Sequence, residues 1–600
     1  MPRKKKEAEG LSPEMQKAYE RLKKVRASST LQFKPCATLR EEITTLTGEK
    51  EPFRLRYYQV QGAYHMMVLK RMILGDACGL GKTVQAIAAL AYLWDRDEGR
   101  DNRVIVVAPK SAIHQWASEI RRFTKGVTPI VASAKASKGK TSVQAREEAY
   151  RQWADAPRGE KVVLITNYSL LVRDWHHGSF QAPGKDGKPD PKAPVKPGLL
   201  DQITSDANGK LLVIFDESTA FKSKRTKTWE VARFLSVKAN RVYGLTATLL
   251  KNKLFEGYCI YGVIRPGLFT TQTDFYDRFC FVELKKIGRA RIPIIKGYRN
   301  LDEFRQVIDP YFLGRQKQFV AKELPTLTTR EVVCKLSPAE EAKYSEALSG
   351  VLELGDGEVK EYEDQKALVS LIYCQQVVNS LAMLKFKEGD IVGDNYVDMD
   401  FDLKRHKVGT LGAKEQGLVN LLTGELEDEK IIVYTRFESL VGRLQAILKR
   451  EGIKSTRITG KEKDKDRRKN QNVFQDPDSD TKVIFLTNAG SEAINLQMAI
   501  GMIFYDAPWS WGDFVQTVGR MIRIGSPHKG VLAFHLIGER PKPDRADQKT
   551  IDHHVLSLLR RKKGLIDKVL GEGAVGALNF DKGGGDIRSL ISAMQGKTSV

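Results

Sequence analysis

The sequence is poor in cysteine and has no long apolar run. Its six cysteines are far apart, with no Cys-x-x-Cys pair and no Cys/His cluster. This spacing argues against a zinc site and indicates a reducing compartment. No apolar run approaches the roughly 20 residues of a membrane helix, so we expect no membrane partner. The basic start, 1–6, has no apolar segment behind it, which is not typical of a secretory signal. It is either a basic arm, a nuclear signal or a solvated tail.

Length and charge indicate a large protein with a polyanionic partner. The chain has 600 residues, 41% of them hydrophobic and 29% charged, which is ordinary for a globular protein of about four domains. The net charge is +24 and the isoelectric point about 9.5. Such an excess of positive charge favours nucleic acid as the partner. The alternative is a basic surface with no ligand.

A glycine-rich stretch at Gly75–Thr83 is the strongest local signal. The apolar run before it, 72–74, predicts a buried strand, and 84–90 predicts a helix. Strand, glycine turn and helix form a phosphate cradle, in which backbone N–H groups and the positive end of the helix dipole face the phosphates. Lys82 is then expected to reach the β and γ phosphates, and the Thr83 hydroxyl to hold Mg²⁺. The alternative is a structural glycine turn.

Three other residues refine this interpretation. The backbones of Gly79 and Gly81 are expected to close on the nucleotide, whereas Asp76 stands where the strict P-loop has a glycine, so the match is to a variant. Gln59, before an amphipathic run, has an amide that can both donate to and accept from an adenine edge. The alternative for Gln59 is an exposed helix glutamine.

Short apolar runs follow the cradle and alternate with helical patterns. Continuous apolar strands separated by helices predict a parallel sheet covered on both faces. One helix is clearly indicated after Ser111, which is expected to cap it. Trp116 falls on the apolar stripe of this helix, where a core position is more common than a contact with a ligand. The proline- and glycine-rich segment 181–198 predicts a surface loop. The predicted strands are 104–107, 162–165, 211–215 and 242–245.

Polar residues end two of these strands. Acidic residues at the carboxyl edge of a parallel strand face the ligand crevice. Asp216 is therefore expected to bind Mg²⁺ through water and Glu217 to orient the attacking water. Thr246 and Thr248 close the next strand, where small hydroxyls can link the nucleotide to a second lobe.

The pattern changes after Leu254. Segments up to about Gly412 are largely helical, including a capping box at 337–340, and are too long for a loop. A second set of apolar runs then predicts a second parallel sheet: 431–434, 483–486, 502–505 and 531–534. It carries no phosphate cradle.

The second sheet instead leads to two arginines. Arg520 and Arg523 are three residues apart, which would place them on one helix face. Aimed at a nucleotide together with Gln516, they can neutralise charge on the transferring γ-phosphate. The alternative is a surface basic pair. The amphipathic segment 550–570 predicts a final helix.

The order of these motifs resembles that of the superfamily-two helicases, and within them the Swi/Snf-like ATPases, from about Leu55 to Leu570. Gln59 stands at the Q-motif position, and Asp76 to Thr83 looks like the family's Asp-Glu-Met-Gly-Leu-Gly-Lys-Thr. The nucleic-acid and coupling residues that the resemblance implies are Lys110, Ser111, Trp116, Thr166, Asn167, Thr246, Thr248, Gly490 and Asn495. Arg315 with Leu324-Pro325 looks like the family's inter-lobe insert, and Gln516, Arg520 and Arg523 match its last motif.

Three departures from the family pattern stand out. Ser218-Thr219 replace the Gly-His or Ala-His that follows the acidic pair, although threonine still offers a hydrogen-bond donor. Ser491–Ala493 replace a Gly-Leu-Gly, and Gly519-Arg520 replace an Ala-Arg. The chain therefore looks like a divergent, compact member, which favours a bacterial or viral protein.

The resemblance implies an α/β fold with two tandem RecA-like lobes, helical inserts between them and a C-terminal brace helix. The expected domains are a basic extension (1–50), a first lobe (51–253), inserts and linker (254–412), a second lobe (413–540), and the brace helix with its tail (541–600). The expected function is an ATP- and Mg²⁺-dependent translocase on double-stranded DNA, in the cytoplasm or alternatively the nucleus. A strand-separating DNA or RNA helicase, and a nucleotide-gated clamp without turnover, are the alternatives.

Overall fold

The computed structural model divides into two compact units. The first holds residues up to 249, 254–275 and 300–316, and the second holds 250–253, 276–299 and the chain from 317 onward. The described residues are 13–570 without 29, 31, 33–34, 45–49, 97–102, 134–140, 158, 177–197, 199, 201–203, 205–210, 251–252, 288–289, 316–319, 321–324, 350, 354–358, 362–365, 385–410, 489–493, 524–525 and 542–548. The predicted surface loop 181–198 thus lies outside them, apart from Gly198.

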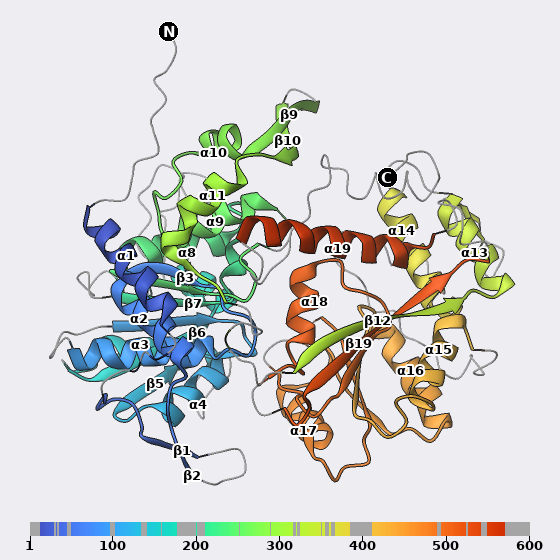
Figure 1. Ribbon diagram of the computed structural model, residues 1–600, viewed down its shortest axis with the longest axis horizontal. Helices are drawn as coiled ribbons and strands as arrows, with labels where there is room; N and C mark the ends of the chain where they lie inside the picture. Colours follow the sequence, from blue (N-terminus) through green and yellow to red (C-terminus); the bar gives the residue numbers. More distant parts are fainter. Residues whose placement is uncertain are drawn as a thin grey trace. The chain divides into compact units, whose positions relative to one another are not determined.

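The first unit is built on a parallel sheet with the strand order β11-β3-β8-β7-β4-β6-β5 (Figure 1). Its inner strands are almost entirely apolar and buried, as a sheet covered on both faces requires. All five strands predicted for this unit are confirmed. The strands are β3 (Arg71–Leu74), β4 (Arg103–Ala108), β5 (Val127–Val131), β6 (Lys161–Asn167), β7 (Leu211–Asp216), β8 (Arg241–Leu245) and β11 (Phe312–Leu313).

The strand order dictates which helices share a face. The chain advances across the sheet from β3 to β4 to β5, and returns through β6, β7 and β8. Because parallel crossovers are right-handed, helices on the outward path cover one face and helices on the return path the other. The outward helices are α3 (Lys82–Arg96) and α4 (Ile113–Phe123), and the return helices are α5 (Ser142–Ala154), α6 (Tyr168–His176) and α8 (Lys227–Lys238).

The segments before β3 pack on this unit. The Gln61 amide nitrogen in α2 (Tyr57–Val68) lies 2.7 to 3.2 Å from three main-chain carbonyls at and just after the end of α1 (Pro13–Ala27), between which its two protons are shared. These bonds satisfy acceptors that the end of a helix leaves without an intrahelical partner. The extension predicted for residues 1–50 therefore includes an ordered helix. A small antiparallel pair, β1 (Glu42–Thr44) and β2 (Lys50–Pro52), follows α1.

The second unit is built on another parallel sheet, with the order β12-β19-β18-β15-β17-β16. The four strands predicted here are confirmed, and the two edge strands are additional. The strands are β12 (Thr326–Lys335), β15 (Ile431–Tyr434), β16 (Ser455–Ile458), β17 (Val483–Leu486), β18 (Gly501–Phe504) and β19 (Gly530–Glu539). Its helices are α13 (Pro338–Ser349), α14 (Lys366–Asn379), α15 (Ala413–Leu422), α16 (Glu438–Arg450), α17 (Asp464–Gln475), α18 (Trp511–Val518) and α19 (Ile551–Leu570).

The final helix is fixed to this unit by a buried carboxylate. Asp552, in the first turn of α19, accepts hydrogen bonds from the Gly538 N–H (2.9 Å) and the Gln375 side chain (3.0 Å). It also forms an ion pair with the buried Lys414 ammonium (2.6 Å). The helix contacts α14 and α18 (Figure 1). Its presence confirms the predicted C-terminal helix.

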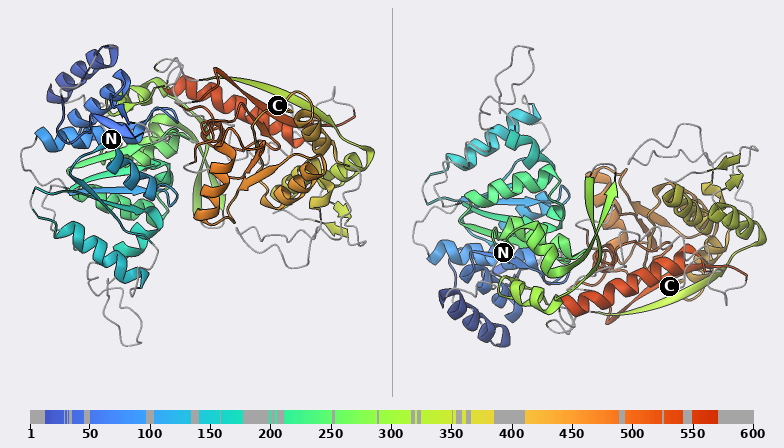
Figure 2. Two further views of the ribbon diagram at one scale, coloured as in Figure 1. Left: turned by 90° about the horizontal axis from the view of Figure 1, so that it is seen from below. Right: turned by 90° about the horizontal axis from the view of Figure 1, so that it is seen from above.

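The segment 254–412 is less uniformly helical than predicted. Its helices include α9 (Leu254–Ile264), α10 (Gln272–Phe279) and α11 (Leu301–Ile308), and the capping box at Ser337 is formed. The prediction missed the strands, however, because β11 has only two residues and β12 is largely exposed and mixes polar with apolar residues. β9 (Cys280–Ile287) and β10 (Ala290–Tyr298) form a separate two-stranded ribbon (Figure 2), and β13 (Val351–Glu353) and β14 (Val359–Glu361) a short second one. No described helix combines the length and apolarity that crossing a bilayer requires.

Candidate active site

The carboxyl ends of five neighbouring strands bring the predicted residues of the first unit together. In a parallel sheet all strands end at the same edge, where ligands bind. Neighbouring strands end at the same height. The last residue of β8, Leu245, pairs with the last residues of β3 and β7, Leu74 and Asp216. The last residues of β4 and β6, Ala108 and Asn167, likewise pair with each other. The order along this edge is the glycine loop after β3, the threonines after β8, the acidic pair at β7, Lys110-Ser111 after β4, and Thr166-Asn167 at the end of β6.

The glycine loop has the backbone geometry of a phosphate cradle. Gly79 (φ 88°) and Gly81 (φ 73°) both lie in the left-handed region, which disfavours side chains. Helix α3 begins at Lys82, directly after the loop, and the N–H groups of its first turn have no partner within the helix and are available to an anion. The Lys82 ammonium lies against the loop and donates to the Asp76 carbonyl (2.8 Å). Thr83 is the second residue of the helix.

The Gln59 amide contacts this loop. Its Oε1 accepts from the Arg56 main-chain N–H (3.0 Å), and its Nε2 lies 3.5 Å from the Leu80 carbonyl. A Cβ on Gly81 would come within 2.7 Å of that Nε2, so this position needs glycine on steric grounds as well as for its φ angle. Gln59 therefore caps the start of α2 and supports the cradle; its contact with adenine stays a prediction.

Asp76 explains why the loop departs from the strict pattern. The side chain is fully buried and accepts two hydrogen bonds from the Arg315 guanidinium (2.9 and 2.5 Å). Gln85 donates to the same carboxylate (2.9 Å). Arg315 also donates to the Tyr58 carbonyl and to Gln61 in α2. A glycine here would leave the guanidinium without its carboxylate, so the aspartate links the loop, α2, α3 and the end of β11.

The Asp216 carboxylate is fixed by one hydrogen bond to each oxygen. The Trp116 indole N–H donates to Oδ2 (2.8 Å), and the Glu217 main-chain N–H donates to Oδ1 (3.0 Å). Each oxygen keeps a further lone pair for a water ligand. The pKa of Asp216 is raised to about 6, mainly by burial and also by the neighbouring Glu217 charge, while the Trp116 hydrogen bond and the Lys82 charge partly offset this rise.

Glu217 adopts a strained conformation that two hydroxyls stabilise. Its φ is 56°, in the left-handed region that residues other than glycine rarely occupy, and such outliers concentrate at functional sites. Thr219 donates to its Oε1 (2.7 Å). The single proton of the Thr246 hydroxyl has two acceptors within reach, the same Oε1 (3.3 Å) and the Thr248 carbonyl (3.1 Å). The threonine that replaces the family's histidine therefore does supply a hydrogen bond to the acidic pair.

The predicted nucleic-acid and coupling residues of the first unit fall into two groups. Lys110 is exposed and Ser111 partly exposed at the edge. Burial excludes direct contact between a ligand and the remaining side chains in this conformation: Trp116, Thr166, Asn167, Thr246 and Thr248. One detail of the prediction is wrong, because the N-cap of α4 is Ala112 and not Ser111. A turn closed by the Ala112 N–H and the Pro109 carbonyl shifts the helix start by one residue.

In the second unit, the prediction that Arg520 and Arg523 share one face of a helix is wrong. Helix α18 carries Gln516 but ends at Val518, with Gly519 as the C-cap, so Arg520 and Arg523 lie in the turns that follow. The Arg523 guanidinium donates a hydrogen bond to the Ile494 carbonyl (3.1 Å). The Nε of Arg520 is buried and has no hydrogen-bond partner within the described chain. Asn495 is partly exposed near this turn, since the Arg520 carbonyl accepts the N–H of the next residue, Leu496. Gly490 lies outside the described residues.

The donors in the first unit fit a magnesium nucleotide. Mg²⁺ prefers hard oxygen ligands and keeps several waters, and is commonly held by one or two carboxylates plus phosphates. The Thr83 hydroxyl and the Asp216 carboxylate are of this type, beside a loop built for phosphate. The described residues that follow the strands of the second sheet contain no Gly-x-Gly-Lys-Thr sequence.

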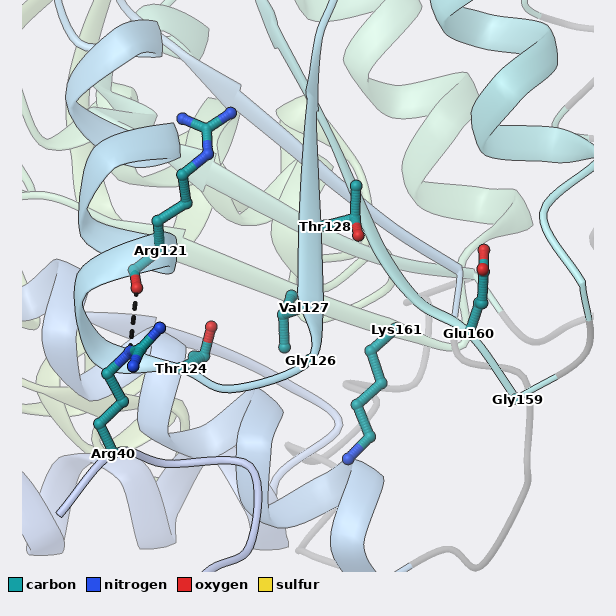
Figure 3. Close-up of a pocket in the computed structure, with 9 residues that line it drawn as sticks. All are labelled: Arg40, Arg121, Thr124, Gly126, Val127, Thr128, Gly159, Glu160 and Lys161. Atoms are coloured by element: carbon teal, nitrogen blue, oxygen red, sulfur yellow. Dashed lines mark hydrogen bonds between the residues drawn. The ribbon is translucent and has the colours of Figure 1, made fainter.

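A cavity of about 540 Å³ lies elsewhere in the first unit (Figure 3). It is lined where β5 and β6 begin, at Val127 and Lys161, and therefore at the sheet edge opposite the glycine loop. Two of its lining residues are joined by a hydrogen bond, from the Arg40 Nε to the Arg121 carbonyl (3.2 Å) (Figure 3). This cavity is not part of the candidate site.

Two contributors to the site were absent from the predicted set. Arg315 is 239 residues from Asp76 in the chain, and its only sequence signal was its place in the resemblance. Tyr168 donates its hydroxyl to the Asp216 carbonyl, and it follows directly on the predicted Thr166-Asn167. Both act on residues that the sequence did single out.

Comparison with known proteins places two family models on the chain. The SNF2-related domain matches residues 58–383, and the helicase conserved C-terminal domain matches 413–525. The ATP-dependent DNA helicase DDM1 of Arabidopsis thaliana is 25% identical over 89% of this chain and 65% of its own length. The uncharacterized ATP-dependent helicase YqhH of Bacillus subtilis is 24% identical over 84% of this chain and 76% of its own.

Several other relatives are much longer than this chain. It spans 44% of mouse SWI/SNF-related matrix-associated actin-dependent regulator of chromatin subfamily A member 1, at 25% identity over 86% of this chain. Among solved structures, the Sulfolobus solfataricus SWI2/SNF2 ATPase core in complex with dsDNA is 20% identical, with a TM-score of 0.36. That match covers 90% of this chain and 96% of the other.

Proposed function

The chain belongs to the SNF2-related family, and from this premise we propose that it hydrolyses ATP to move along duplex DNA. The observation that carries the proposal is the position of the acidic pair, on β7, which is separated from the strand of the glycine loop, β3, by β8 alone. Asp216 accepts a hydrogen bond on each oxygen, and Glu217 accepts one from Thr219, with the Thr246 hydroxyl close to the same oxygen. Such preorganisation is what a hydrolytic site needs.

Each residue then has a role. The loop N–H groups and Lys82 bind the β and γ phosphates, and Glu217 orients the attacking water. Mg²⁺, held through Thr83 and Asp216, would neutralise charge on the phosphates. Arg520 and Arg523, with Gln516, act on the γ-phosphate from the second unit, where the unpartnered Nε of Arg520 supports this role.

The case for nucleic acid rests on charge and on the relatives. The net charge of +24 favours a polyanion, and Lys110 is exposed at the site's edge. One relative that the chain matches along most of its length is named a DNA helicase. Contacts to phosphates carry no sequence information, so we propose little sequence preference and a steep salt dependence.

ATP turnover with and without duplex DNA tests the proposal. We expect stimulation by duplex at low salt, less by single strands or RNA, and loss of stimulation as salt rises. Absence of any stimulation by duplex would contradict the proposal. Glu217→Gln separates a motor from a clamp, because a motor is expected to trap ATP without hydrolysis, whereas a clamp would be unaffected.

Strand separation is the second candidate, because Thr219 and Gly519 depart from the Swi/Snf-like pattern. A labelled fork distinguishes the two. Release of a strand favours a helicase, whereas displacement of a triplex-forming strand without unwinding favours a translocase.

The domain limits and the compartment belong to the same proposal. We propose a first lobe at 51–253, inserts at 254–412, a second lobe at 413–540 and a brace region at 541–600. The insert region adds one edge strand to each sheet, β11 to the first and β12 to the second. We propose that the protein acts in the cytoplasm or nucleus. Limited proteolysis followed by mass spectrometry of the fragments checks the limits.

A further inference from the structure

We propose that Trp116 is a positioning residue that ties nucleic acid bound at the start of α4 to the Asp216 carboxylate. The inference deepens the proposed function and rests on it for the identity of the ligand. It assigns to a buried tryptophan a role in hydrolysis without direct contact with nucleotide or nucleic acid.

The first step is the contact itself. The Trp116 side chain is 1% exposed, and its N–H donates to Asp216 Oδ2 (2.8 Å) across 100 residues of sequence. An indole has one donor and no acceptor, so this bond uses its entire hydrogen-bonding capacity. Hydrogen bonds to a charged acceptor are also the stronger ones.

The second step is the connection from Trp116 to the exposed edge. The Trp116 main-chain N–H donates to the Ala112 carbonyl (2.9 Å), and the Ala112 N–H to the Pro109 carbonyl (2.9 Å). Lys110 and Ser111 are the two residues inside that turn. A phosphate that pulls on this turn therefore moves the helix start, and with it the indole that holds the carboxylate.

The third step is a second bond at the same aspartate. The Tyr168 hydroxyl donates to the Asp216 carbonyl, and its ring packs edge-on against Phe221 (5.6 Å between centroids). Tyr168 begins α6, directly after Asn167 at the edge. A side chain from the segment after β4, Trp116, and one from the segment after β6, Tyr168, thus each donate one hydrogen bond to Asp216.

The chain offers a matched control for packing alone. Trp153 is equally buried, at 1%, and donates its N–H to the Val104 carbonyl (3.0 Å). Its acceptor is near the start of β4, at the end of the strand away from the site. Replacing either tryptophan removes one indole and one buried hydrogen bond, but only Trp116 touches the acidic pair.

The test compares Trp116→Phe with Trp153→Phe in the full chain. For Trp116→Phe we expect about a tenfold loss of duplex-stimulated kcat. The KM for ATP and the affinity for duplex should stay within twofold of wild type, and Trp153→Phe should keep its stimulation. Binding of a fluorescent ATP analogue as Mg²⁺ is titrated gives a readout without turnover, in which Trp116→Phe should need several-fold more Mg²⁺.

The outcomes separate the two proposals. If wild type binds the Mg²⁺ nucleotide but shows no duplex-stimulated hydrolysis, the proposed function fails, while the Mg²⁺ titration still decides the role of Trp116. If Trp116→Phe matches Trp153→Phe in both assays, the inference is wrong. If Trp116→Phe does not fold, Trp116→benzothienylalanine replaces only the N–H by sulfur and must show the same losses. If wild type binds no nucleotide, both proposals fail.

Discussion

The Arg315 guanidinium binds the Asp76 carboxylate through two hydrogen bonds, 2.9 and 2.5 Å long, between residues 239 positions apart. The pair is buried, with Asp76 fully enclosed and Arg315 at 10% exposure. It joins the last segment of the first unit to the base of the glycine loop. The shape of the phosphate cradle therefore depends on a residue from the far end of that unit.

The first prediction concerns the stability of this pair. Removing one partner of a buried ion pair leaves a charge without compensation and costs about 3–5 kcal/mol. We expect that loss for Asp76→Asn or Arg315→Gln, with faster hydrogen exchange in α2 and α3. If the loss of unfolding free energy in the double variant Asp76→Asn/Arg315→Gln equals the sum of the two single losses, the pairing is contradicted.

The exposed pair of Arg330 and Glu425 is the control. Both side chains are more than half exposed, and exposed pairs contribute below about 1 kcal/mol. Arg330→Gln should therefore leave hydrogen exchange in the second unit nearly unchanged.

The second prediction concerns the hydroxyl that replaces the family's histidine. Thr219→Val removes a donor to Glu217, and a hydrogen bond to a charged group contributes about 1.5–3 kcal/mol. We expect kcat for ATP to fall about tenfold, with KM within twofold and recovery in Thr219→Ser. Thr124→Val is the control, because its buried hydroxyl donates only to the Ile120 carbonyl at the end of α4. Equal kcat values for Thr219→Val and Thr124→Val would contradict the role.

The third prediction concerns pH. His65 is fully buried, and its pKa is lowered to about 3 by burial and by the charges of Arg26 and Arg315. Its Nδ1 lies 2.7 Å from the Gln61 carbonyl, and the Arg26 guanidinium donates to Nε2, which fits a neutral ring protonated on Nδ1. Asp309 pairs with the same guanidinium.

The sign follows from the lowered pKa. The unfolded chain binds the proton near pH 6.5, whereas the folded chain does not, so stability is complete above that value and falls as pH drops toward 3. We expect a loss of about 2 kcal/mol at pH 5, measured by urea denaturation of the first unit. His65→Gln should remove that part of the pH dependence. An unchanged slope between pH 7 and 5 in this variant would contradict the assignment.

The sequence predicted the central strands because each is a continuous apolar run, as in β4 and β7. It missed β5 and β16, which pair on one side only and contain polar residues such as Thr128 and Arg457. Edge strands bury less surface, so their pattern is weaker.

For the site, local spacing identified the glycine loop and the acidic pair. It did not reveal their partners, since Arg315 and Trp116 reach them only through tertiary contacts. The error over the two arginines has a local cause, because α18 stops at Gly519 instead of continuing through Arg523.

The fourth prediction tests the central claim, that residues of both units act on one ATP. The measurement is steady-state ATP turnover by Arg520→Ala with saturating duplex DNA. We expect kcat to fall by about 10³ or more, with KM for ATP within a few fold, because the role proposed for this arginine is to stabilise charge in the transition state. Arg450→Ala is the control, since Arg450 is an exposed arginine at the end of α16 to which the proposal assigns no role. A kcat for Arg520→Ala within twofold of wild type would contradict the account.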